Sequence, residues 1–546
     1  MMSLTGSRPA RLGVRIHARR RPRWPALAIA AIAVTVAAPA ASVTASLFAG
    51  AGEAQAHIWS TMGPRYLFGT LALCVLVGFG AGLIGSVGAA LTALTEFPGR
   101  RFFSVALALP FAAPAYVVAY AYADFLGPFG PFASVLRDGF GVSALPEIRS
   151  MPGAAFVLTL TVYPYVYLAM RADLAARSTA YLEAARALGA KPAAAFRRVL
   201  APAARAAFAG GLALALMETA ADFGVADYFG VATLSVGIVR TWQGLGDLTA
   251  AAQLAAGLFF IAALLAVMEE SARRGERAES ARARRGAARL RLSRPQGILA
   301  AAFCATPGLF GFVLPASVLI SKLPAATTIG AARGLDAALG NSALVAALGA
   351  IVAMTLALIL AYAARRALKG GARLALRAAT MGYAMPGAVI AVGVLTLGAH
   401  AGRPFGLVLT GGIGVLIYAY AARFLTAGYN AASAGLQQIS PLMDAAARSL
   451  GAGPAGVVSR IHWPLSRGAL TAGALIVFID IVKELPATLL LRPFNFETLA
   501  TRVYRLASDE RLADAAPAAL LLIGLGLLPT ILLYAAGGRK REEPAS

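Results

Sequence analysis

Two pairs of carboxylates stand out in this largely apolar chain of 546 residues. Glu218 and Asp222 are four residues apart, and so are Asp480 and Glu484, which follow them at a common offset. Side chains at this spacing share one face of a helix, so each pair presents both carboxylates to the same side. Carboxylate oxygens are ligands for hard cations, and acids inside a membrane are costly and usually functional. The two pairs therefore predict a pathway for a metal cation or another cationic substrate.

A structural role is the alternative reading of the same acids. Each pair comes near the end of a predicted membrane span, where charged residues are common, and Lys483 or Arg492 could neutralise the acids there. We include Lys483 with the four acids as a candidate residue of the pathway. Replacing the acids by alanine and measuring passage of the cation separates the two roles.

The chain shows no motif with which it could bind ATP itself. A phosphate-binding loop needs a Gly-rich turn followed by Lys and then Ser or Thr. The five lysines are followed instead by Pro, Leu, Gly, Glu and Arg: Lys191, Lys322, Lys369, Lys483 and Lys540. No nucleophile–base arrangement and no metal-ligand cluster is evident in the sequence. We therefore expect no catalytic residue, no cofactor bound by this chain and no metal site that can be assigned with certainty.

Composition predicts a polytopic membrane protein. Hydrophobic residues make up 59% of the chain and charged residues only 14%, against about 25% charged in soluble domains. Apolar stretches long enough to cross a bilayer recur along the whole length. The formal net charge is +24, but the arginines cluster at the ends of apolar runs, as the positive-inside rule expects. The expected partner of this surface is the lipid bilayer, and no nucleic acid.

We predict about twelve transmembrane helices, and charge sets their orientation. They cover residues 25–48, 66–94, 103–124, 153–172, 203–222, 250–268, 298–320, 342–364, 374–397, 406–422, 466–484 and 513–535. The N-terminus carries seven arginines and no acid before the first span, so we expect it to stay in the cytoplasm together with the C-terminus. The first run is too long for a signal peptide, which favours an uncleaved span. Residues 483–512 carry several arginines on the predicted outer side, and we expect part of this segment to dip into the protein.

The chain divides into two similar halves. Residues 25–268 and 298–535 each hold six predicted spans, and an Arg-rich linker, 269–297, joins them. The basic segment 1–24, the linker and the tail 536–546 are all predicted to be cytoplasmic. Since each half has an even number of spans, both enter the membrane from the same side and form parallel repeats about an axis along the membrane normal. Transport along that axis is the expected class of function.

Each half contains the same basic, alanine-rich segment. Residues 183–202 read "EAARALGAKPAAAFRRVLAP" and residues 445–464 read "AAARSLGAGPAGVVSRIHWP". Gly and two Pro stand at matching offsets, and each segment is predicted to form a short helix–turn–helix on the cytoplasmic face. One copy could simply be a surface helix that connects two spans. Two matched copies on the same side favour a docking surface for another protein.

These segments resemble the EAA motif of binding-protein-dependent ABC importer permeases. The residues that carry the resemblance are Glu183, Ala184, Ala185, Gly189 and Pro202 in the first copy and Ala446, Ala447, Gly451 and Pro464 in the second. The second copy departs at its first position, where Ala445 stands and the acid, Asp444, comes one residue early. In this family the motif forms coupling helices that sit in clefts of the ATP-hydrolysing subunits. The resemblance implies an all-α fold of two type I permease repeats and two copies of a cytoplasmic ABC ATPase, which bind ATP and Mg.

The segment after Glu484 carries a narrower resemblance. Its sequence "KELPATLLLRPFNF" closely resembles the second half of ferric-iron ABC importer permeases, and residues 217–242 are similar to the equivalent part of the first half. Two repeats fused in one chain are typical of that subfamily, which pairs with a periplasmic ferric-binding protein. The resemblance implies import of iron(III) across the bacterial inner membrane by alternating access.

Other substrates stay open. Thiamine and phosphonate importers share the fused architecture, and aromatic residues facing the axis would favour a stacking ligand over an ion. The candidates are Tyr116, Tyr120, Tyr122 and Tyr383. A secondary transporter without an ATPase is a further alternative, but it leaves the two docking segments unexplained.

Overall fold

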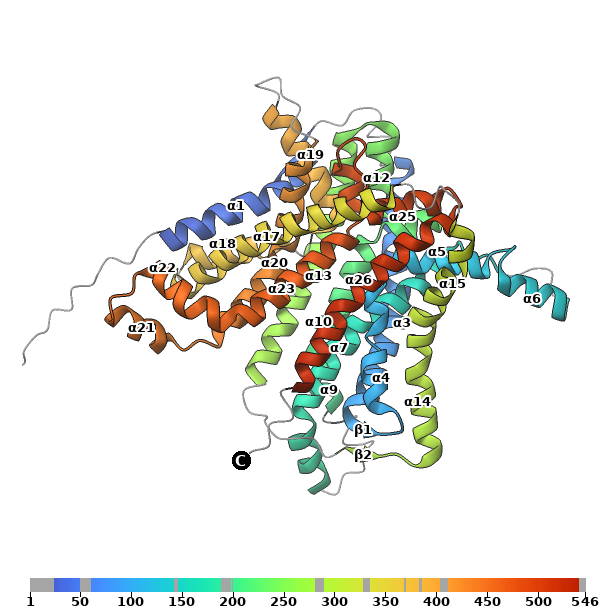
Figure 1. Cartoon of the computed structure of the whole chain (residues 1–546), viewed down its shortest axis with the longest axis horizontal. Helices are drawn as coiled ribbons and strands as arrows, with labels where there is room; N and C mark the ends of the chain where they lie inside the picture. The colour runs from blue at the N-terminus through green and yellow to red at the C-terminus, as the bar shows by residue number, and fades with distance from the viewer. Residues whose placement is uncertain are drawn as a thin grey trace, which may run out of the picture.

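The computed structural model is helical almost throughout (Figure 1). It describes residues 24–49, 60–141, 146–187, 198, 200–279, 289–327, 334–367, 370–382, 385–402 and 411–539. In that part of the chain the strands are β1 (Thr95–Glu96) and β2 (Leu290–Arg291), which pair in parallel. The predicted class of an all-α polytopic membrane protein is confirmed.

The first half begins with a long helix and contains several short ones. Its helices are α1 (Trp24–Ala45), α3 (Gly63–Leu94), α4 (Arg100–Ala106), α5 (Ala115–Leu126), α6 (Pro131–Phe140), α7 (Met151–Ala187), α9 (Ala201–Ala203), α10 (Arg205–Ala221), α11 (Gly224–Tyr228), α12 (Leu234–Leu245) and α13 (Leu248–Glu279). The second half likewise combines long and short helices. Its helices are α14 (Arg294–Gly308), α15 (Leu314–Lys322), α17 (Leu335–Ala367), α18 (Gly371–Ala379), α19 (Gly387–Gly402), α20 (Ile413–Gln437), α21 (Pro441–Ser449), α22 (Pro454–Val457), α23 (Trp463–Lys483), α24 (Pro486–Leu491), α25 (Leu499–Ser508) and α26 (Leu512–Arg539).

Seven helical stretches of the described chain are long and apolar enough to cross a membrane, or eight if a bent pair counts as one span. The bent pair is the predicted span 103–124, where the chain turns by 91° between residues 112 and 115. Pro114 stands at this turn, and proline has no N–H to continue a helix. The predicted span 374–397 is likewise divided, into α18 and α19. The total of twelve spans therefore stays a prediction.

The two halves repeat their internal packing. Helix α3 packs on α7 as α17 packs on α20, and α10 packs on α7 as α23 packs on α20. The first helices of each half pack against the other half. Helix α1 packs on α17, α18 and α19 of the second half, and α14 and α15 pack on α3, α4 and α5 of the first half as well as on α26. The halves are thus interlocked rather than merely adjacent. Figure 1 shows α12 and α25 at one end of the molecule and α9, β1 and β2 at the opposite end.

The linker between the halves is partly structured. Helix α13 continues to Glu279, so the first residues of the predicted linker 269–297 are helical. Near its end, β2 pairs with β1 of the first half, and Glu96 forms ion pairs with Arg100 (3.1 Å) and Arg289 (3.7 Å). These contacts bind the end of the linker to the start of the first half.

Candidate functional site

A cavity of about 970 Å³ lies between the two halves. Residues of α5, α7, α10, α11, α13, α18, α20, α23 and α24 line it. All five residues of the predicted pathway are among them: Glu218, Asp222, Asp480, Lys483 and Glu484. The structure thus brings together side chains that are 262 positions apart in the sequence. Their role in transport stays a prediction.

Each acid pair lies at a break between two helices. Helix α10 ends before Asp222 and α23 ends before Glu484, and both acids have extended backbone. The Oδ1 atom of Asp222 accepts hydrogen bonds from the N–H groups of Val225 (3.0 Å) and Ala226 (3.1 Å). The Oε1 atom of Glu484 accepts one from Ala487 (3.2 Å). The two acids therefore accept hydrogen bonds from backbone N–H groups in the first turns of α11 and α24, which have no partner within their own helix. Broken helices of this kind line substrate sites in other transporters.

The cation that neutralises Glu484 is Arg423 of α20, which sequence reasoning missed. The two side chains form an ion pair, with 14% and 5% of their surfaces exposed. The alternatives suggested by sequence make other contacts: the Nζ atom of Lys483 lies 3.4 Å from the Phe111 carbonyl oxygen, and Arg492 donates to the Phe496 carbonyl oxygen (3.3 Å). The only signal for Arg423 was a single arginine inside the apolar run "YAYAARFL".

The two halves differ at this point of the cavity. At the repeat offset Arg423 corresponds to Thr161, which also lines the cavity. The Thr161 hydroxyl donates to carbonyl oxygens of its own helix, Val157 (3.2 Å) and Leu158 (3.1 Å). Asp222 therefore has no arginine in the place where Glu484 has one.

Negative charge prevails in the cavity. Six acids and three basic residues line it: Glu218, Asp222, Glu269, Glu270, Asp480 and Glu484 against Arg377, Arg423 and Lys483. The whole chain has a formal net charge of +24, so the sign in the cavity is opposite to that of the protein. A wall of this sign raises the local concentration of cations and repels anions.

One end of the cavity is closed by contacts between the halves. The rings of Phe223 and Tyr504 lie 5.5 Å apart, and the Tyr504 hydroxyl donates to Oδ2 of Asp227 (2.8 Å). Nearby, Arg149 of the first half forms an ion pair with Glu510 of the second (2.7 Å). We call this layer the closed end; it lies beside α11 and α25. In the other direction the cavity extends to Arg377 of α18 and to Glu269 and Glu270, at the start of the linker that was predicted to be cytoplasmic.

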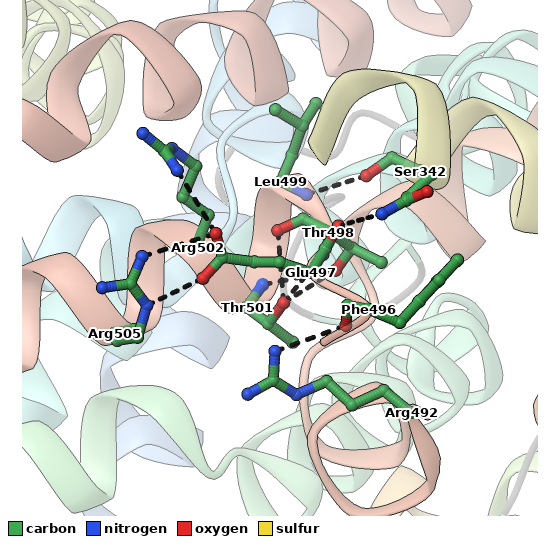
Figure 2. A network of polar contacts seen from close by, with 10 residues as sticks. Ser342, Arg492, Phe496, Glu497, Thr498, Leu499, Thr501, Arg502 and Arg505 are labelled. Carbon is green, nitrogen blue, oxygen red and sulfur yellow. Dashed lines mark hydrogen bonds and ion pairs between the residues drawn. The ribbon is translucent and has the colours of Figure 1, made fainter. Parts of the chain in front are cut away.

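The connection between α24 and α25 is held by a polar network (Figure 2). Glu497 accepts hydrogen bonds from Arg502 (3.2 Å) and Arg505 (2.7 Å). The Ser342 hydroxyl of α17 accepts one from the Leu499 N–H (2.7 Å), as Thr70 of α3 does from Leu234 (2.9 Å) in the first half. Of the arginines in 483–512 that depart from the positive-inside rule, Arg502 thus pairs inside the protein, whereas Arg505 pairs with the same glutamate while about half exposed.

The structure describes the first docking segment only in part. Glu183, Ala184 and Ala185 lie in the last turns of α7, and Pro202 lies in α9. Gly189 lies outside the described residues.

The second docking segment is described in more detail. Helix α21 carries Asp444, Ala446 and Ala447. Gly451 follows it with φ = 83°, a conformation that favours glycine, and Pro464 opens α23. Large apolar side chains of this segment are exposed: Leu442 by 78% and Leu450 by 87%.

Asp444 points into the protein rather than to the docking surface. It is 6% exposed, accepts a hydrogen bond from His462 Nε2 (2.7 Å) and forms an ion pair with Arg365 (3.3 Å). His462 is itself buried. Burial raises the pKa of the Asp444 carboxyl, but the hydrogen bond and charge of His462 and the charge of Arg365 outweigh it and hold that pKa below its usual value.

The contacts of Asp444 with His462 and Arg365, which we call the Asp444 tether, predict that the stability of α21 depends on pH. A carboxyl with a depressed pKa stabilises the fold above its unfolded pKa, about 3.9 for Asp, and loses that contribution as pH falls through the folded value. We expect the amides of α21 to keep their protection from hydrogen exchange between pH 7 and 5, after correction for intrinsic rates, and to lose it below about pH 4. Asp444→Asn should lower the opening free energy by about 1–3 kcal/mol at pH 7. Asp138→Asn, an exposed acid on α6, is the control; equal protection in both variants would contradict the tether.

Comparisons with known proteins agree with this architecture. Residues 81–269 match the family described as "Binding-protein-dependent transport system inner membrane component". The chain is 27% identical over 481 residues to an Fe(3+)-transport system permease protein of Haemophilus influenzae, covering 86% of this chain and 89% of that one. It is also 34% identical over 95 residues, 17% of this chain and 35% of the other, to a "Probable molybdenum ABC transporter permease protein" of Haloferax volcanii. A protein of Salmonella typhimurium named for 2-aminoethylphosphonate transport is 28% identical over 166 residues, 30% of this chain and 58% of that one.

Proposed function

We propose that this chain, which belongs to the family of binding-protein-dependent transport system inner membrane components, translocates iron(III) across the bacterial inner membrane. Its similarity to the Fe(3+)-transport permease extends over both halves, whereas the other two relatives match a smaller part of it. The observation that carries the proposal is the excess of acids in the cavity between the halves of a strongly basic chain. Carboxylate oxygens suit a hard, highly charged cation.

Members of this family work with an ATPase and a solute-binding protein. For this chain we infer two copies of a cytoplasmic ABC ATPase, which bind ATP and Mg at their own sites and dock at the two EAA segments. We infer a periplasmic binding protein of the ferric-binding type on the opposite side, and both chain termini in the cytoplasm. The closed end at α11 and α25 and the extension of the cavity toward α13 and α18 are compatible with a state that faces the cytoplasm.

Reconstitution tests the proposed substrate. The full chain is assembled in proteoliposomes with an ABC ATPase and a ferric-type binding protein from the same organism. Uptake of radioactive iron(III), thiamine and 2-aminoethylphosphonate is then measured with and without ATP. We expect ATP-dependent uptake of iron(III) alone. Uptake of thiamine but not iron would overturn the proposal, and uptake without ATP would favour a secondary transporter.

The cavity acids should affect transport through their charge. We expect the triple variant Glu218→Gln, Asp222→Asn and Asp480→Asn to lower iron(III) uptake by about tenfold or more, because the carboxylates that attract the cation become neutral. Asp222 also caps α11, and asparagine keeps a carbonyl oxygen for that purpose whereas alanine does not. Asp222→Asn should therefore impair uptake with little loss of stability, and Asp222→Ala should add a loss of about 1 kcal/mol. Unchanged uptake and unchanged substrate-stimulated ATPase activity in the triple variant would remove these acids from the pathway.

A further inference from the structure

Two buried tyrosine hydroxyls have no hydrogen-bond partner among the described residues: those of Tyr116 and Tyr120. Both side chains belong to α5 and are 5% and 1% exposed. Other buried tyrosines of the same half are satisfied: the Tyr163 hydroxyl donates to the Leu107 carbonyl oxygen (2.7 Å) and that of Tyr167 to the Ser104 carbonyl oxygen (2.9 Å). A buried hydroxyl without a partner lowers stability, so these two need an explanation.

The two tyrosines connect the cavity with the closed end. Tyr116 lines the cavity, its ring lies 5.9 Å from that of Tyr120, and the Tyr120 ring lies 4.5 Å from that of Tyr228. The Tyr228 hydroxyl accepts a hydrogen bond from Arg149 (2.9 Å), which is part of the closed end. We call Tyr116, Tyr120 and Tyr228 the tyrosine file. It forms a continuous row of phenol groups from the cavity to the contacts that close it.

A carboxylate stands near each end of the file. At one end Glu484 lines the same cavity as Tyr116. At the other end Asp227 is the residue before Tyr228 in α11, and its Oδ2 atom accepts a hydrogen bond from the Tyr504 hydroxyl (2.8 Å). Gly224, at the break between α10 and α11, lies against the Tyr116 side chain: a Cβ atom there would come within 2.6 Å of the Tyr116 Cβ. The file is therefore packed directly against the broken helix that positions Asp222.

The geometry does not fit a stacking ligand, for which these aromatic residues were candidates. The rings of the file contact one another and are buried, so no open face is left on Tyr120 for an organic ring. What is unsatisfied is the oxygen atom of each phenol. Tyr122 donates its hydroxyl to the Phe310 carbonyl oxygen (2.7 Å), and Tyr383 lies outside the described residues. When Pro114 is aligned with Pro386, the second half has Ala388 and Val392 at the positions of Tyr116 and Tyr120, so the file belongs to the first half alone.

We propose that the hydroxyl oxygens of Tyr116 and Tyr120 are transient ligands for the trivalent cation as it passes from the outer side into the cavity. This inference rests on the proposed function. Phenol and carboxylate oxygens are hard donors, which suit a hard cation. In the described part of the chain no three His, Cys, Asp or Glu side chains gather closely enough to hold a metal ion. The proposed ligands would therefore bind the cation only during its passage.

Phenylalanine substitution separates this role from packing, because it removes only the hydroxyl. We expect the double variant Tyr116→Phe and Tyr120→Phe to fold with equal or higher thermal stability, since no hydrogen bond is lost. Its ATP-dependent uptake of radioactive iron(III), measured in proteoliposomes with the ATPase and the binding protein, should fall by about tenfold or more. The matched control is Tyr163→Phe, which loses a hydrogen bond: its stability should fall while its uptake is unchanged.

The outcomes are distinguishable. Reduced uptake with undiminished stability in the double variant supports the ligand role. Wild-type uptake in the double variant overturns it, and so does a fall of uptake that is matched by a fall of stability, which would assign the file to packing. If the wild-type chain imports no iron(III) in the same assembly, the proposed function itself fails, whatever the variants do.

Discussion

Replacement of Arg423 by methionine is expected to lower the free energy of unfolding by about 3–5 kcal/mol, because Glu484 is then left charged and unpaired in a buried site. Glu484 is 6% exposed, and its ion pair with Arg423 joins α20 to the break between α23 and α24. The measurement is thermal or denaturant unfolding of the purified chain in detergent. This is the largest change of stability that we expect from a single substitution in the cavity.

A second variant shows whether the loss comes from the unpaired charge. The double substitution Arg423→Met and Glu484→Gln should recover much of the stability, since buried ion pairs can often be replaced by uncharged side chains at little cost. Arg377→Met serves as the control: its ion pair with Glu270 is half exposed and 3.9 Å long, so the expected change is about 0–1 kcal/mol. If Arg423→Met were no more harmful than Arg377→Met, Glu484 would have to be solvated through the cavity.

The substitution pair Leu442→Asp and Leu450→Asp is expected to release the ATPase from the second docking segment. Both leucines are largely exposed on or next to α21, an arrangement typical of apolar anchors that fill pockets of a partner. Two introduced charges would have to be buried in the interface, so we expect affinity to fall by about thirtyfold or more. Co-purification with the ATPase, with the ratio of subunits determined by mass, measures the effect.

A substitution far from the second docking segment supplies the control. Leu245→Asp changes a leucine that is also largely exposed (68%) at the end of α12, near the opposite end of the molecule (Figure 1), and should leave the complex intact. Since the first docking segment is untouched, the variant should lose at least one of the two ATPase copies. Retention of both copies would show that α21 is not a docking surface.

Much of the architecture is predictable from local sequence. The class follows from apolar runs, and the division into halves follows from repeated segments such as 183–202 and 445–464. The convergence of the two acid pairs in one cavity follows from the repeat as well, because equivalent positions of parallel repeats face a common axis. The helix breaks were harder to predict. Asp222 and Glu484 follow the last residues of α10 and α23 and cap the N-termini of α11 and α24. A carboxylate within an apolar stretch of sequence does not by itself indicate that capping role.

The sequence by itself determined the kind of protein, the positions of the acids and the repetition of the EAA segments, because composition, spacing and repetition can be read from the order of the residues alone. Only the tertiary structure decided which groups meet. It paired Glu484 with Arg423 instead of Lys483 or Arg492, and it turned Asp444 inward to His462. It also left the hydroxyls of Tyr116 and Tyr120 without partners while satisfying their neighbours. The physical reason is the same in each case: the energy of a buried polar group depends on the atoms that helices distant in the sequence place beside it.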